Sequence, residues 1–226
     1  MERREFLRKM AALSVGVFAA DRGAKAWAKG LPSDPGGPAG GGTADVIALP
    51  PFEKNNTFSL DRALLERKSA SSFADRPLSR EELSRLLWAT TGVNREDGHR
   101  TTPSGRGSYP VDVLVALPEG VFRYEPKEHR LVRVLGEDIR GKIPNQDEFK
   151  KAAMTVLYLI NKEKAYRMDA ADLEIGCMGQ NLYLEATALG MGARIIGNIK
   201  TADVTKILGL KESQIFRIAQ VAGPIR

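Results

Sequence analysis

The segment Arg67-Lys-Ser-Ala-Ser-Ser-Phe73 combines two adjacent cationic side chains with hydroxyl groups. The guanidinium of Arg67 can make paired hydrogen bonds to phosphate oxygens, and Lys68 and Ser69 can add further donors. The segment therefore predicts a phosphate contact. A solvated surface is the other interpretation of the same residues, since short runs of charge usually face water.

A second segment, Thr102-Pro-Ser-Gly-Arg-Gly-Ser-Tyr-Pro110, precedes a run of apolar residues. Gly105 and Gly107 have no side chain to keep a ligand away from the backbone, so the backbone N–H groups could point toward it. An ordinary turn rich in glycine and proline is the alternative interpretation.

A third segment, Gly190-Met-Gly-Ala-Arg-Ile-Ile-Gly-Asn198, has glycines spaced partly as in a dinucleotide-binding fingerprint. Ile195 stands where the third glycine is required, and the segment follows an expected helix rather than a strand. The pattern on its own favours the end of a helix followed by a strand.

Composition excludes several other kinds of site. Cys177 is the only cysteine, so a disulfide framework and a multi-cysteine metal site are excluded, and a small core residue is expected. His99 and His129 lack the spacing of metal ligands. The net charge of +6 comes without a basic stripe interleaved with aromatic residues, which gives no support to nucleic-acid binding.

Helices and strands must position these segments. A short helix is expected over residues 59–67, with Leu60, Ala63 and Leu64 on one face. Residues 79–82, Ser-Arg-Glu-Glu, form a capping box that opens a second helix. The remaining expected elements are strands 111–117, 120–124 and 130–135, a short helix within 138–153 broken at Pro144, strand 154–160, helix 169–189, strand 193–196, helix 201–208 capped by Thr201, and strand 214–221. Strands and helices mix without regular alternation, which predicts an α+β domain.

Residues 1–28 have the order of regions found in an export signal. Arg3 and Arg4 resemble a twin-arginine motif, and the apolar stretch 10–20 is too short to span a membrane, which takes about twenty residues. An amphipathic helix of a cytosolic protein and an uncleaved membrane anchor are the alternatives. Residues 29–46 are rich in glycine and proline and are expected to form a linker to a folded domain at 47–226.

Taken together, the segments resemble the FMN-dependent nitroreductase family in order and spacing, over roughly residues 50 to 226. The resemblance rests on the run 67–73, a capped helix ending Leu-Trp-Ala-Thr-Thr-Gly at 87–92, Pro103-Ser-Gly, Tyr109-Pro110, the helix segments 174–186 and 188–192, and Val-Ala-Gly-Pro at 221–224. Tyr109-Pro110, the following strand and the hairpin 120–131 are similar to the SagB-type dehydrogenase branch.

This resemblance implies a nitroreductase-like mixed sheet flanked by helices, in a homodimer with FMN at the dimer interface. Arg67, Lys68 and Ser69 are implied to hold the phosphate and ribityl chain, Ser71 replaces a second arginine, and Arg226 stands near a basic position that completes the phosphate site. The implied contacts to the isoalloxazine ring are Pro103, Ser104, Gly105 and Gly107, with Arg106 facing FMN or substrate, and the backbone of Ile196, Gly197 and Asn198 near flavin N5 and O4.

The implied function is an oxidoreductase that reduces or dehydrogenates a small nitro, quinone or related substrate by ping-pong hydride transfer on FMN. No catalytic side chain and no metal are implied, because the flavin supplies the chemistry. A donor such as NAD(P)H conflicts with an exported, periplasmic location. A peptide-maturation dehydrogenase is one alternative, although Ala165 separates Lys164 from Tyr166 where SagB-type azoline oxidases have an adjacent Lys-Tyr pair. A non-catalytic flavin-binding or interaction module is the other.

Overall fold

The computed structural model describes residues 46–52 and 57–226. The expected export signal and nearly all of the expected linker lie outside the described residues. Val46, the last residue assigned to the linker, is instead the first residue of a strand. In the described ranges, no helix combines the length and apolar character that crossing a membrane requires.

Seven strands form one sheet in the order β1-β4-β3-β2-β5-β7-β6. The strands are β1 Val46–Ala48, β2 Val111–Leu117, β3 Gly120–Glu125, β4 Arg130–Leu135, β5 Met154–Asn161, β6 Met191–Ile196 and β7 Gln214–Pro224. All six neighbouring pairs are antiparallel, with registers such as Val115 opposite Val156. Among the described residues, the mixed character expected of the sheet is limited to one isolated parallel bridge, between Ser69 and Ala193.

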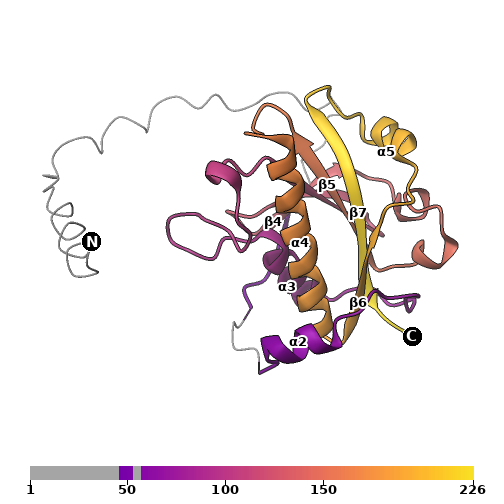
Figure 1. Ribbon diagram of the computed structural model, residues 1–226. Helices are drawn as coiled ribbons and strands as arrows, with labels where there is room; N and C mark the ends of the chain where they lie inside the picture. The colour runs from indigo at the N-terminus through magenta and orange to yellow at the C-terminus, as the bar shows by residue number, and fades with distance from the viewer. Residues whose placement is uncertain (1–45, 53–56) are drawn as a thin grey trace, which may run out of the picture. The chain divides into compact units, whose positions relative to one another are not determined.

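Four α-helices accompany the sheet within the described ranges: α2 Leu60–Glu66, α3 Arg80–Thr91, α4 Met168–Ala188 and α5 Thr201–Leu208. The main core contains apolar side chains of the sheet together with those of α3 and α4, such as Leu86 and Leu182. A second cluster, on alternate residues of the central strands, contains Val204 of α5. Helices therefore cover both faces, and the α+β class is confirmed (Figure 1).

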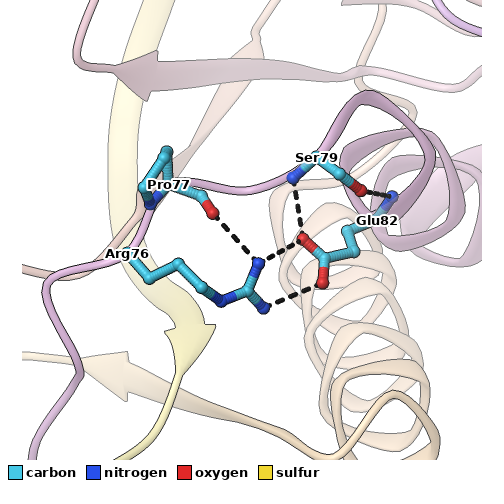
Figure 2. Close-up of polar contacts among 4 residues, drawn as sticks. All are labelled: Arg76, Pro77, Ser79 and Glu82. Carbon is cyan, nitrogen blue, oxygen red and sulfur yellow. Dashed lines mark hydrogen bonds and ion pairs between the residues drawn. The ribbon is translucent and has the colours of Figure 1, made fainter.

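A capping box fixes the start of α3 (Figure 2). Ser79 Oγ accepts from the Glu82 N–H at 3.1 Å, and Glu82 Oε2 accepts from the Ser79 N–H at 2.7 Å. The Arg76 guanidinium donates to both oxygens of Glu82, at 3.1 and 2.8 Å. These bonds satisfy N–H groups that the first turn of a helix leaves without partners, and they hold Arg76, just before the helix, against its first turn.

Helix α4 is the longest helix of the described residues and lies along the sheet (Figure 1). Its buried residues include Ile175, Met178, Leu182 and Ala186, at spacings of three and four, as the sequence predicted. Gly190 follows with φ +67°, a conformation that suits glycine and ends the helix. The chain then returns along α4 as β6.

Two sequence predictions about local structure were wrong. Residues 138–153 contain two 3-10 turns, Arg140–Lys142 and Asp147–Phe149, rather than a helix interrupted at Pro144. Proline lacks an N–H and disfavours the helical conformation of the residue before it, which leaves too few residues on either side for an α-helix. Thr201 does not cap α5: it is the first helical residue, and Lys200 occupies the cap position without a side-chain bond.

The apolar face of α2 is only partly covered. Ala63 is buried, whereas Leu60 is 63% exposed, Leu64 52% and Leu65 86%. Burying such side chains is worth about 1.5–3 kcal/mol each, so their exposure within one chain leaves a surface suited to contact with another molecule.

Candidate functional site

A cavity of about 570 Å³ opens where the segment after α2 passes β6 and the C-terminal residues. The lining includes side chains able to bind an anion: Lys68, Ser69, Ser71, Ser72 and Arg226. Glu66, Thr187 and residues 190–192 form further parts of its wall. Two cations and several hydroxyl groups against one carboxylate suit a phosphate group.

The cavity forms because segment 69–71 lies beside the edge strand β6. The Ala70 N–H donates to the Ala193 carbonyl at 3.0 Å, and Arg194 Nη1 donates to the Ala70 carbonyl at 3.3 Å. A Cβ atom on Gly192 would lie 2.6 Å from the Ala70 Cβ and would also clash with Ile225. Glycine at 192 therefore lets the segment, the strand and the C-terminal residues converge.

Tyr183 connects the segment to the helix and the strand. Its hydroxyl lies 3.2 Å from Ser69 Oγ and accepts from the Ile195 N–H at 2.8 Å. The guanidinium carbon of Arg67 lies 5.3 Å from the centre of the Tyr183 ring. Arg67 does not line the cavity itself but lies next to Ser69, on the face of this aromatic ring.

The loop 103–109 forms a second group of predicted residues. Pro103, Arg106 and Gly107 are exposed, while Ser104 and Gly105 are half-buried. Gly105 packs toward Ala170 in the first turn of α4, because a Cβ atom there would lie 3.6 Å from the Ala170 Cβ.

The structure does not bring this loop to the cavity within one chain. Thr187 lines the cavity, whereas Ala170 contacts the loop, and the two residues are seventeen positions apart in α4. At about 1.5 Å per residue, that separation is roughly 25 Å. The predicted phosphate and ring contacts thus lie near opposite ends of α4.

The third predicted group, Ile196, Gly197 and Asn198, follows the same strand that forms the cavity wall. Ile196 is buried, so only its backbone could face a ligand, while Gly197 and Asn198 are exposed. Asn145 holds Asn198 in place: its Nδ2 donates to Asn198 Oδ1 at 2.5 Å, and its N–H donates to the Asn198 carbonyl at 3.3 Å. Asn145 was missed in the sequence, since no local pattern pairs residues so distant.

A family model for the nitroreductase family matches residues 64–223. The chain belongs to the nitroreductase family. A nitroreductase-like protein of Methanocaldococcus jannaschii is 31% identical over 182 residues, covering 74% of this chain and 90% of that protein. The family-model match begins within α2 and includes every predicted site residue except Arg226.

Solved structures with the same fold agree with the assignment. A nitroreductase-like protein of Ralstonia eutropha has a TM-score of 0.77 and 32% identity, with 88% of this chain and 96% of that chain covered. A nitroreductase-like protein of Desulfovibrio desulfuricans, solved in complex with FMN, has a TM-score of 0.56 and 24% identity, with 73% and 86% covered. The second likeness shows the fold alone.

One buried acid in this nitroreductase-family chain was not singled out in the sequence. Glu174 of α4 is 2% exposed, and among the described residues neither of its carboxylate oxygens has a hydrogen-bond partner. Burial raises the pKa of Glu174, and the nearby Ser104 and Arg100 oppose that shift. The sequence does contain a signal of this burial, because Glu174 stands four residues before Met178, on the apolar face of the same helix.

Other reactive residue types have structural partners. Ser84 Oγ lies 2.6 Å from His129 Nε2, and the Tyr124 hydroxyl lies 2.9 Å from His129 Nδ1. Ser84 has no exposed surface, and its hydroxyl donates to the Pro50 carbonyl at 2.6 Å. These contacts therefore hold the chain around Pro50 against α3 and offer no open nucleophile.

Cys177 is half-exposed rather than a core residue. No cluster of three metal-ligating side chains occurs in the part of the chain that the structure describes.

Proposed function

We propose that this nitroreductase-family protein binds FMN and acts as an oxidoreductase on a small organic substrate such as a nitro compound or quinone. The observation that supports this most directly is the cavity with Lys68, Ser69, Ser71 and Arg226, which matches the charge and hydrogen-bonding needs of a phosphate. The FMN in the complex of the Desulfovibrio protein supports the choice of cofactor.

The residues present fit such a cofactor. Lys68 and Arg226 would neutralise the phosphate, and Ser69 and Ser71 would donate hydrogen bonds to it or to the ribityl chain. The exposed backbone of Gly197 and Asn198 would face the ring. When bound, FMN supplies the acceptance and release of hydride in two separate half-reactions. The protein's contribution is to bind, to orient and to place polar groups where charge develops.

We further propose that each complete site needs two copies of the chain. Measured by the rise along α4, the cavity and the 103–107 loop lie roughly 25 Å apart. That distance is too large for one chain to supply both ends of one site. A two-fold partner with α4 running the opposite way would place its loop near the first copy's cavity. The exposed Leu60, Leu64 and Leu65 of α2 provide apolar surface for such contact.

The visible absorption spectrum of the purified full chain tests the proposal. A yellow protein that is bleached by NADH or NADPH supports a nitroreductase-type cycle with a nicotinamide donor. Bleaching by dithionite alone supports a flavin enzyme with a different donor. A colourless protein that fails to take up added FMN would contradict the proposed cofactor and the proposed function with it.

We also propose that the protein is exported, on the sequence of residues 1–28. Replacing Arg3 and Arg4 together by lysine is expected to shift the full chain from the periplasmic to the cytoplasmic fraction. A distribution that does not change would contradict twin-arginine export.

A further inference from the structure

The loop that carries Arg106 has an unusual and well-fixed backbone. Arg106 has φ +58° and Tyr109 has φ +45°, a left-handed region that side-chain-bearing residues rarely adopt. Hydrogen bonds hold the loop: the Tyr109 N–H donates to Ser104 Oγ at 2.9 Å, and the Ser108 hydroxyl donates to the Gly105 carbonyl at 3.0 Å. Strained backbone that is held this firmly is typical of binding sites.

The Arg106 side chain is held as well. Its guanidinium carbon lies 3.7 Å from the centre of the Tyr166 ring, the shortest such distance among the cation–π contacts of the described residues. Tyr166 lies just before α4 and is 49% exposed. A guanidinium that stacks on an aromatic ring keeps its N–H donors directed outward in the plane of the group.

Those donors have no acceptor within the described part of the protein. No carboxylate there forms an ion pair with Arg106, whereas the nearby Arg167 is paired with Asp169 and Arg217 is paired with Asp172. Lys164, two residues before Tyr166, is another exposed cation. Arg106 is therefore a pre-ordered cation without a counter-ion among the described residues, within the loop that is expected to contact the cofactor ring.

Apolar surface adjoins this cation. Leu173 is 73% exposed and stands one turn after Ala170, the residue against which Gly105 packs. Met168, at the start of α4, is 37% exposed. Together with the Tyr166 ring these side chains offer a surface for an aromatic body, with the guanidinium at one edge.

We propose that Arg106 and Tyr166 form a subsite for a planar aromatic substrate that carries an anionic group, such as an aromatic carboxylate. This inference rests on the proposed flavin oxidoreductase function. Arg106 binds the anionic group with its in-plane donors, and Tyr166 is a positioning residue that holds the guanidinium. The subsite differs from the phosphate contacts, which lie at the other end of α4.

The test compares 4-nitrobenzoate with uncharged nitrobenzene on the full-length, FMN-supplemented protein. Arg106→Gln is expected to weaken 4-nitrobenzoate by about tenfold or more, in KM and in a calorimetric Kd measured without an electron donor, because a charge-assisted hydrogen bond is lost. The values for nitrobenzene are expected to change less than about twofold. Tyr166→Leu should weaken 4-nitrobenzoate to a smaller degree, and Tyr166→Phe should resemble the parent protein, since the ring is retained.

Arg80→Gln is the control, because it removes the same charge from an exposed position at the start of α3. The proposal is overturned if Arg106→Gln weakens both ligands equally, or if it shifts the midpoint potential of the bound flavin while 4-nitrobenzoate binding is unchanged. Absence of 4-nitrobenzoate binding to the parent protein also overturns it. A failure to bind FMN would contradict the proposed function. The two failures can be told apart, because the calorimetric titration with 4-nitrobenzoate decides independently whether the subsite exists.

Discussion

The hydroxyl of Tyr183 lies 3.2 Å from that of Ser69, and it also accepts from the Ile195 N–H at 2.8 Å. One buried side chain of α4 thus fixes both the segment that lines the cavity and the strand beside it. Its ring additionally lies under the guanidinium of Arg67. This hydroxyl therefore helps to hold the cavity wall, together with the backbone bond from Ala70 to Ala193 and the close approach that Gly192 allows.

Tyr183→Phe is therefore expected to weaken FMN binding by about tenfold, since Ser69 loses the contact that orients it. The free energy of unfolding is expected to fall by about 1–3 kcal/mol, because the Ile195 N–H loses its side-chain acceptor. Quenching of FMN fluorescence measures the first effect, and urea unfolding measures the second.

Tyr158→Phe provides the matched control. Tyr158 is fully buried, and its hydroxyl donates to Gln220 Oε1 at 2.8 Å, so its loss should also lower stability. Tyr158 does not line the cavity, and FMN affinity should therefore remain close to that of the parent. Equal losses of FMN affinity in the two variants would show that Tyr183 acts through general stability.

Glu174 predicts a specific dependence of stability on pH. Burial raises its pKa in the folded state, so the folded protein holds this proton at pH values where the unfolded chain has released it. The contribution of Glu174 to the free energy of unfolding is therefore fully present below the ordinary pKa of glutamate, about 4.3. It is lost as the pH rises through the raised pKa of the folded state. Asp112, whose pKa burial also raises, acts in the same direction.

Glu174→Gln removes the ionisation and is expected to raise the free energy of unfolding at pH 7 by about 1 kcal/mol. The gain should vanish near pH 4, where the parent carboxyl is protonated. Urea unfolding at both values measures it, with the exposed Glu212→Gln as a control that should show no gain. A stability loss at pH 7 would instead indicate that the carboxylate is ionised and has a partner such as a bound water.

Most of the secondary structure was predictable because it depends on local patterns. The capping box at Ser79, the apolar spacing in α4 and the Val-rich run of β2 each specify an element without reference to the rest of the chain. Residues 138–153 were not predictable in this way. Ile139 and Ile143 are buried at helical spacing, but Gly141 and Pro144 allow only 3-10 turns.

The sequence predicts the candidate site as a set of segments and not as an arrangement. The residue types at 67–71 and 103–107 indicate phosphate and ring contacts, but the distance between them depends on where each segment contacts α4. Tyr183 and Asn145 act through partners distant in sequence, so no local spacing reveals their roles.

The Arg76–Glu82 pair predicts an acid-sensitive contribution to stability. The hydrogen bond from Arg76 is the main cause that lowers the pKa of Glu82, with the Ser79 N–H adding to it. This contribution is present above the ordinary glutamate pKa and is lost as the pH falls through the lowered value. Glu82→Gln should therefore cost up to about 1 kcal/mol at pH 7, because the ion pair is half-exposed, and less at pH 3, below the ordinary pKa of glutamate.

Thermal unfolding at the two pH values measures this difference. Glu81→Gln is the control, since Glu81 is an exposed acid in the same first turn of α3 and takes no part in the capping box. A loss as large at pH 3 as at pH 7 would show that the shape of the Glu82 side chain, and not its charge, stabilises the cap.

The arrangement of sites between two copies can be tested by complementation. One variant, Lys68→Glu with Ser71→Asp, places negative charge in the cavity, and a second, Pro103→Trp, obstructs the exposed loop at the other end of α4. Each variant alone is expected to lose FMN binding, because both sites of its homodimer contain either an altered cavity or an altered loop. In a mixed dimer, one site combines the intact cavity of one copy with the intact loop of the other.

Mixing equal amounts under subunit-exchange conditions should therefore restore FMN to about a quarter of all sites, because half of the dimers are mixed and each has one intact site. Bound flavin per chain, measured by absorbance after gel filtration, gives the result. A triple variant with all three changes in one chain, mixed with an equal amount of the parent protein, is the control: both sites of each mixed dimer carry one defect, so bound flavin should fall from about half of all sites to about a quarter. Flavin that stays at half of all sites in that control, or no restoration in the first mixture, would indicate that a single chain supplies both ends of the site despite their separation along α4.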